Sequence, residues 1–177
     1  MKIAVASDHR GYAAKQKIAA FLSEHSHTVE DFGCEGPASC DYPEHGFGAA
    51  ECVARGDAET AVIFCGTGIG MSITANKVRG IRAALCHDEL TAELARQHNN
   101  ANVLCLPADL LGDELLKRVV DAWLRTGFDG GRHERRLNKI AAYEQNGAAS
   151  VCTPKSKSTK THPHGEGQTK GSRKKDS

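Results

Sequence analysis

Residues 61–72 read Ala-Val-Ile-Phe-Cys-Gly-Thr-Gly-Ile-Gly-Met-Ser, and they carry the most informative pattern in this chain. The apolar start is typical of a buried strand, and the alternating glycines that follow predict a tight turn at the start of a helix. Such a turn lets the backbone approach a ligand, and the unpaired N–H groups of the helix favour an anion there. The same field favours a thiolate at Cys65, which makes this residue a candidate base or nucleophile. The alternative is a cysteine that only packs at the end of a strand.

The sequence on either side alternates short apolar runs with segments of helical pattern. The predicted strands cover residues 2–6, 28–32, 61–65, 81–85 and 102–106, and the predicted helices cover residues 12–24, 43–55, 70–77, 88–98 and 111–126. A glycine pair at 130–131 then precedes a last helix that ends near residue 146. This alternation predicts an α/β fold with three layers, α/β/α, in which a parallel sheet lies between two layers of helices.

The net charge of +1 over 177 residues hides an uneven distribution along the chain. Residues 155–177 contain seven basic residues, two acidic ones and no large apolar residue, so this segment cannot bury a core. We therefore expect one domain over residues 1–150 and a basic, disordered tail over residues 151–177. The domain itself carries more acidic than basic groups, which argues against nucleic-acid binding. A loose contact between the tail and a nucleic acid or another anionic surface is the alternative to a solvated tail.

The composition also predicts the compartment. No apolar run approaches the ~20 residues that a membrane-spanning helix needs, and polar residues follow the first strand too soon for a signal peptide. The seven cysteines are an odd number and include no C-x-x-C pair, which indicates reduced thiols rather than a disulfide framework or a zinc site. We expect a cytoplasmic protein that does not contact membranes.

Asp8 and His9 follow the first predicted strand directly. Ligands bind beyond the carboxyl ends of the strands in open parallel sheets, so both side chains should project into the same crevice as the glycine turn. Asp8 can orient or protonate a hydroxyl group, and His9 can bind an anion or relay a proton. The alternative is that Asp8 caps the helix that begins near Gly11.

Two further groups of polar residues lie at helix ends. His98 ends a predicted helix and is either a favourable partner of the helix dipole or a functional group. Asn99 and Asn100, which follow it, indicate hydrogen bonding to hydroxyl groups or a left-handed cap. Arg132 and Arg136 are four residues apart, so on a helix they share one face and suit a phosphate or a carboxylate. An exposed basic face is the alternative for this pair.

Several common sites are excluded by the spacing of the glycine turn. It lacks the G-K-[ST] ending of a nucleotide P-loop, and its G-x-G-x-G spacing differs from the dinucleotide-binding fingerprint. A cysteine phosphatase needs an arginine six residues after its cysteine, where this chain has Met71. The sequence contains neither an H-E-x-x-H motif nor a cluster of carboxylates, so no metal site is predicted.

With these residues assembled, the chain resembles the ribose-5-phosphate isomerases of type B, in the wider group that includes galactose-6-phosphate isomerase subunits. The matching stretches are I-A-V-A-S-D-H-R-G at 3–11, D-Y-P at 41–43, F-C-G-T-G-I-G-M-S-I-T-A-N-K at 64–77, G-I-R-A at 80–83, R-Q-H-N-N-A-N-V-L at 96–104, D-A-W-L at 121–124 and G-G-R-H-E-R-R at 130–136. The resemblance covers residues 1–147. It implies a five-stranded parallel sheet in the order 2-1-3-5-4 and a reaction that needs neither a metal nor an organic cofactor.

The resemblance also implies a role for individual residues. Cys65 would move a proton between C1 and C2 of the open-chain sugar, and His98 would open the furanose ring with Asp8 and Thr67 beside it. The active sites would lie at a homodimer interface, so that His98 and Asn99 serve the neighbouring subunit. The substrate-binding residues implied are His9, Tyr42, Gly66, Gly68, Ile69, Gly70, Ser72, Asn99, Arg132 and Arg136.

The expected activity is the interconversion of D-ribose 5-phosphate and D-ribulose 5-phosphate, a step of the non-oxidative pentose phosphate pathway, through a cis-enediolate. The alternatives are isomerisation of a hexose 6-phosphate of the allose or galactose type, and binding of a sugar phosphate without catalysis. One position departs from the family: Asp109 stands where members often have an arginine that binds phosphate. Either Arg132 and Arg136 suffice, or Asp109 points away, or the affinity for phosphate is weaker than usual.

Overall fold

The computed structural model describes residues 1–146, and its centre is a five-stranded parallel sheet. The strands are β1 (Lys2–Ser7), β2 (Thr28–Asp31), β3 (Thr60–Cys65), β4 (Ala83–Leu85) and β5 (Val103–Pro107). They lie in the order β2-β1-β3-β5-β4, and each neighbouring pair is parallel. The sheet confirms the α/β fold that the alternating pattern predicts and the strand order that the resemblance implies.

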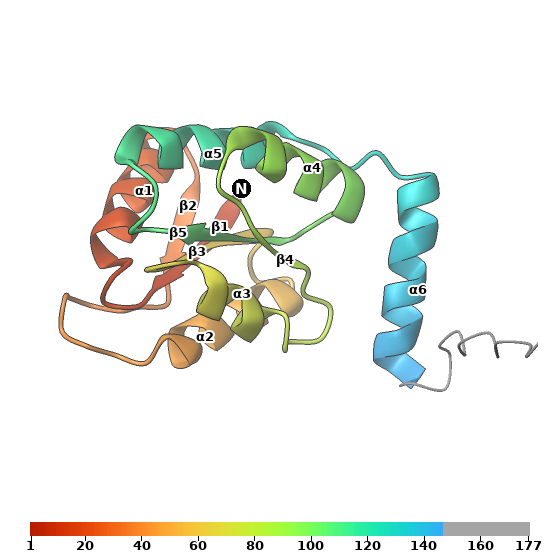
Figure 1. Ribbon diagram of the computed structural model, residues 1–177, viewed down its shortest axis with the longest axis horizontal. Coiled ribbons are helices and arrows are strands. Elements are labelled where there is room, and N and C mark those ends of the chain that lie inside the picture. The colour runs from red at the N-terminus through yellow and green to blue at the C-terminus, as the bar shows by residue number, and fades with distance from the viewer. Residues whose placement is uncertain (147–177) are drawn as a thin grey trace, which may run out of the picture.

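Helices cover both faces of this sheet. They are α1 (Tyr12–Glu24), α2 (Tyr42–Ala54), α3 (Ile69–Ala75), α4 (Glu89–Asn99), α5 (Asp113–Arg125) and α6 (Arg132–Asn146). Helices α2 and α3 lie on one face and helices α1, α4 and α5 on the other, as Figure 1 shows. Helix α6 stands apart from these three layers (Figure 1).

The side chains of β3 alternate between two buried clusters, because successive residues of a strand point to opposite faces. Val62 and Phe64 pack with apolar residues of α1, α4 and α5. Ala61, Ile63 and Cys65 pack with residues of α2 and α3. Cys65 therefore faces the layer formed by α2 and α3, and this places it directly beneath the glycine turn that begins α3.

Local hydrogen bonds explain where helix α4 and strand β4 begin and end. The Asp88 carboxylate accepts a hydrogen bond from the Thr91 amide at 2.7 Å and completes a capping box at the start of α4. Asn100 ends α4 with φ 41°, which is the left-handed cap that was one of the two interpretations of the asparagine pair. Strand β4 is shorter than predicted because the Arg82 amide donates to the side chain of Asn102 rather than to a strand.

Within residues 1–146, no helix is long and apolar enough to cross a membrane. The predicted tail over residues 151–177 lies outside the described residues, and so does the end of the domain predicted at residue 150.

Candidate active site

The carboxyl ends of β1, β3 and β5 form one edge of the sheet, called here the carboxyl edge, and Cys65 lies at its centre. Ser7 pairs with Phe64, so Asp8 comes level with Cys65, while Cys65 itself pairs with Pro107. The Asp8 amide donates to the Phe64 carbonyl at 3.2 Å. The structure thus brings Asp8 beside Cys65, as predicted from their positions after two strands of one sheet.

The glycine turn is held in place by the segment that follows β5. The Ala108 amide donates to the Cys65 carbonyl at 2.9 Å, and the Asp109 amide donates to the Gly66 carbonyl at 3.0 Å. Gly68 has φ 72°, a left-handed conformation that favours glycine, and it turns the chain into α3. Cys65 is 5% exposed, so its thiol lies under the turn rather than on the surface.

Asp8 and His9 have defined partners at this edge. One oxygen of Asp8, Oδ1, accepts hydrogen bonds from the amides of Arg10 and Gly11, both at 2.9 Å. This oxygen therefore holds the turn that precedes α1. The cap residue of α1 is Gly11 and receives no side-chain cap hydrogen bond, so the alternative in which Asp8 caps the helix is wrong. Nδ1 of His9 accepts a hydrogen bond from the Cys40 amide at 3.4 Å, and this contact orients the ring so that Nε2 remains for a ligand.

The remaining residues predicted around the turn line its outer side. The Tyr42 ring, at the start of α2, lies against Gly70, because a Cβ there would come within 2.8 Å of the ring. Thr67 and Ile69 are exposed, and the Thr67 hydroxyl accepts a weak hydrogen bond from the Ile69 amide at 3.4 Å. Ser72, in the first turn of α3, is half-buried, and it slightly opposes the rise that burial causes in the pKa of the Cys105 thiol.

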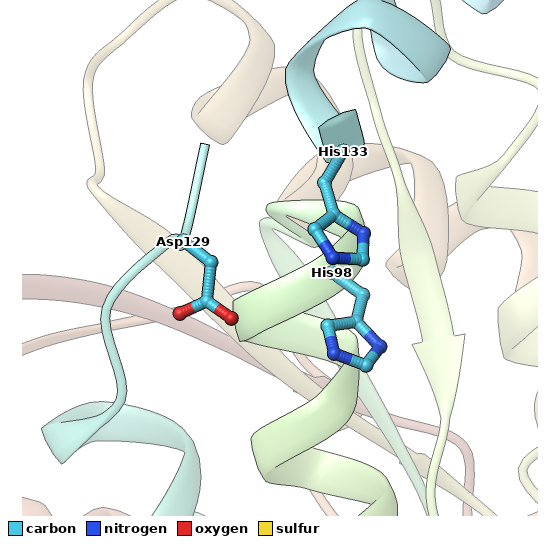
Figure 2. Close-up of side chains that lie close together, drawn as sticks. All are labelled: His98, Asp129 and His133. Carbon is cyan, nitrogen blue, oxygen red and sulfur yellow. The ribbon is translucent and has the colours of Figure 1, made fainter. Parts of the chain in front are cut away.

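A second group of predicted residues lies elsewhere, around the end of α4 and the start of α6. His98, Asp129 and His133 form a cluster, called here the histidine cluster, whose ligand atoms lie within 4.8 Å of one another (Figure 2). The two imidazole rings are stacked, with centroids 4.3 Å apart and planes inclined by 4°. The Asp129 amide donates to the Gln97 carbonyl at 3.1 Å, which fixes the carboxylate beside the end of α4.

Arg132 and Arg136 both lie on α6, four residues apart as predicted, and both side chains are exposed. Nε of Arg132 donates a hydrogen bond to Nε2 of His133 at 3.2 Å, so this ring nitrogen is an acceptor and carries no proton. Asn99 is exposed at the last turn of α4. These residues form a polar surface beside the histidine cluster that an anion can reach.

The histidine cluster has the residue types of a metal site, but its geometry favours proton handling. A metal ion lies in the plane of each imidazole that binds it, along the nitrogen lone pair. The stacked rings of His98 and His133 have nearly parallel planes, so one ion cannot lie in both as they are placed. Nε2 of His133 also accepts the hydrogen bond from Arg132. Two imidazoles and a carboxylate at this distance suit the storage and transfer of a proton.

Cys65 and His98 lie at opposite ends of the sheet within one chain. Cys65 pairs with the last residue of β5, whereas His98 belongs to the last turn of α4, just before β5 begins. At about 3.3 Å per residue, the length of β5 alone separates these ends by about 13 Å. They also belong to opposite faces, because α4 packs with α5 and Cys65 packs with α2 and α3. A single chain therefore does not bring the two residues together.

Burial lowers the pKa of His133 from its usual value of 6.5. The neighbouring His98, Arg132 and Arg136 act in the same direction, because a second positive charge beside them is unfavourable, and Asp129 opposes them. The folded protein thus binds this proton less readily than the unfolded chain. It follows that the free energy of unfolding falls as the pH drops from about 6.5 through the lower pKa of the folded state.

We therefore expect the urea concentration at the midpoint of unfolding to be lower at pH 5.5 than at pH 7.5, and we expect His133→Gln to reduce this difference. The measurement is a urea titration at both pH values and at one protein concentration, because self-association changes apparent stability. His87→Gln is the control, since His87 is exposed and lies away from the cluster. An unchanged fall in the His133→Gln protein would show that this ring does not carry the effect.

Comparison with known proteins decides the family. Residues 3–140 match the Ribose/Galactose Isomerase family. The chain belongs to this family. It is 44% identical to ribose-5-phosphate isomerase B of Escherichia coli (strain K12) over 144 residues, which cover 81% of this chain and 97% of that protein.

Solved structures of isomerases agree with the fold of this one. Ribose-5-phosphate isomerase B of Clostridium thermocellum matches with a TM-score of 0.81 and 46% identity, covering 82% of this chain and 98% of that one. The enzyme of Mycoplasma genitalium, solved with bound ribulose-5-phosphate, matches with a TM-score of 0.79 and 43% identity, covering 82% and 97%. Both similarities extend over nearly the whole described part of this isomerase.

Sequence reasoning missed three residues that the structure places among the candidates. His133 lies within the G-G-R-H-E-R-R stretch, directly after Arg132, and this position beside a predicted phosphate-binding residue could have identified it. Asp129 carried no signal, because its approach to His98 depends on a backbone hydrogen bond to α4. Arg10 lies beside His9 and contacts Asp109, which is 99 residues away in sequence.

Proposed function

We propose that this chain catalyses the interconversion of D-ribose 5-phosphate and D-ribulose 5-phosphate. The observation that carries the proposal is a buried cysteine at the end of a central strand, placed under a glycine turn in a member of the ribose/galactose isomerase family. An isomerase of this kind needs a base beside the sugar carbons and hydrogen-bond donors where negative charge develops. The Cys65 turn supplies both from one loop.

In this mechanism Cys65, as the thiolate, removes the proton from C2 of the open-chain aldose and returns it to C1. The hydroxyl proton passes from O2 to O1, so that the aldose becomes a ketose without any net change in composition. The backbone amides around Gly66 to Gly70, at the start of α3, donate to the enediolate oxygens, because amides of a first helical turn lack partners within the helix. Asp8, which is level with Cys65 at the carboxyl edge, and Thr67 of the glycine turn would contact the ring oxygen and hydroxyl groups.

The opening of the furanose ring is assigned to His98 of a second copy of the chain. Within one chain His98 is at the opposite end of the sheet from Cys65, so a complete site requires two copies. Exposed apolar side chains support an association surface, since Ile69 and Ile73 on α3 and Ile140 on α6 are each more than half exposed. His9 from one subunit, with Arg132 and Arg136 from the other, would hold the phosphate, and Tyr42 and Asn99 would line the sugar.

The six cysteines within residues 1–146 are all free thiols, which suits a reducing compartment such as the cytoplasm. There the reaction would serve the non-oxidative branch of the pentose phosphate pathway. The histidine cluster and the Cys65 turn supply the acid and the base, so the proposed steps use no organic cofactor or metal.

The purified protein should equilibrate ribose 5-phosphate and ribulose 5-phosphate at an undiminished rate in EDTA, because side chains move both protons. In D2O, the NMR signal of the C2 hydrogen of ribose 5-phosphate should disappear during turnover. A protein that only binds sugar phosphates would leave that hydrogen in place. A higher kcat/KM for allose 6-phosphate or galactose 6-phosphate than for ribose 5-phosphate would overturn the choice of substrate in favour of the hexose alternative.

A further inference from the structure

Arg10 and Asp109 form an ion pair that lies over Gly66 at the carboxyl edge. Nε of Arg10 is 2.7 Å from Oδ2 of Asp109, and Nη2 is 2.5 Å from the same oxygen. A Cβ atom at Gly66 would overlap Oδ2 of Asp109 and would approach Nε of Arg10 to 2.7 Å. Since Gly66 directly follows Cys65, this ion pair covers the backbone next to the proposed proton-transfer site.

Both partners are anchored by their own backbone. The Asp109 amide donates to the Gly66 carbonyl at 3.0 Å, and the Arg10 amide donates to Oδ1 of Asp8 at 2.9 Å. The two residues come from the segments after β5 and β1, on either side of β3. The charged groups are therefore held at fixed positions above the turn, although they are far apart in sequence. Asp109 does not point away from the site, which removes one of the three possibilities left by the sequence.

The Arg10 side chain can bind a second anion while it is paired. A guanidinium group carries five N–H donors, and the bonds to Oδ2 of Asp109 use two of them. The side chain is 60% exposed, so the other donors are accessible to a ligand. Guanidinium groups bind phosphate through short charge-assisted hydrogen bonds. Because Asp109 is paired with Arg10, its negative charge is already compensated when a phosphate approaches.

We propose that Arg10, positioned on Gly66 by Asp109, is a phosphate-binding residue of this isomerase. The inference rests on the proposed function to the extent that the substrate is a sugar phosphate. Arg10 would thus supply, from the segment after β1, the positive charge that the resemblance implies at position 109. Asp109 is a positioning residue, which acts on the substrate through Arg10.

The first test measures binding of inorganic phosphate by isothermal titration calorimetry to the full chain, to Arg10→Ala and to Arg118→Ala. Arg118 is a matched control, because its side chain is 61% exposed and pairs with Glu89 at 2.5 Å, between helices α5 and α4. Loss of a charge-assisted hydrogen bond should weaken binding by about 10- to 100-fold in Arg10→Ala and leave Arg118→Ala unchanged. Equal phosphate affinity in the Arg10→Ala protein and the wild type would overturn the proposal.

The second test separates binding from damage to the turn. For ribose 5-phosphate, Arg10→Ala should raise KM by the same factor as it weakens phosphate binding, with kcat within about threefold. A fall in kcat at unchanged KM would show a structural role for the pair and would overturn the proposal. The double variant Arg10→Asp with Asp109→Arg keeps the pair and reverses it, and it should recover most of the lost affinity. If the double variant bound phosphate as weakly as Arg10→Ala, an arginine at position 109 would not replace Arg10, and the proposed exchange of the two positions would be overturned.

The two tests distinguish this inference from the proposed function. If the protein turns out not to isomerise ribose 5-phosphate, the calorimetric comparison of Arg10→Ala with Arg118→Ala still decides whether Arg10 binds phosphate. If the protein is an active isomerase whose KM does not depend on Arg10, the proposed function stands and this inference fails.

Discussion

Cys65→Ala is expected to lower the turnover of ribose 5-phosphate by about 1000-fold, because a positioned base contributes about 10²- to 10⁴-fold to a proton transfer. The alanine removes the thiol but leaves the strand and the glycine turn, so binding of ribose 5-phosphate should persist. Turnover is measured from the equilibration of the two sugars, and C2 proton exchange in D2O should disappear together with it. Retained binding with lost exchange would assign the base to Cys65.

The control for this prediction is Cys105→Ala, which removes a buried thiol on the neighbouring strand. Burial raises the pKa of Cys105 well above its usual value, so this group remains a neutral thiol and takes no part in proton transfer. The variant should keep kcat within a few fold of wild type and lose some stability from the cavity it leaves. If Cys65→Ala were as active as Cys105→Ala, the base would have to be another residue.

Mixed dimers provide the second large expected effect. Cys65→Ala and His98→Asn chains should each be nearly inactive alone, because each lacks a group that moves a proton. If a complete site takes Cys65 from one chain and His98 from the other, a purified dimer of one variant with the other contains one intact site. Such a dimer, isolated through a different tag on each chain, should show about half of the wild-type activity.

The reciprocal dimer is the control for this experiment. It combines a wild-type chain with a chain that carries both substitutions, so every site of a two-chain arrangement lacks either Cys65 or His98. We expect this dimer to be nearly inactive. If each chain instead forms its own site, the outcomes are exchanged: the reciprocal dimer keeps half of the activity and the first mixed dimer is inactive.

The elements were largely predictable from the sequence because they depend on local patterns. Runs such as residues 61–65 are continuously apolar, because side chains on both faces of the sheet are buried. Glycines interrupt the pattern where helices begin. The bounds of the helices agree with the prediction within about two residues, which is the usual uncertainty of helix ends. The shortened strand β4 was not predictable, since it depends on a hydrogen bond from Arg82 to the side chain of Asn102.

The candidate site divides in a similar way. The placement of Asp8 beside Cys65 follows from the topology, because parallel strands end at a common edge. The stacking of His98 on His133 does not follow from any pattern, since the residues belong to different helices and meet through the connection between α5 and α6. The ion pair of Arg10 with Asp109 likewise joins two loops on opposite sides of β3.

The sequence by itself determined the chemistry and the order of the elements: a cysteine before a glycine turn, polar residues after strands, and the alternation that builds a parallel sheet. The tertiary structure decided which of these groups meet. It placed Cys65 and His98 at opposite ends of the sheet, joined His98 to His133, and set Asp109 against Arg10. The physical reason is that strand and helix patterns arise from neighbours along the chain, whereas distances between side chains depend on how the layers pack.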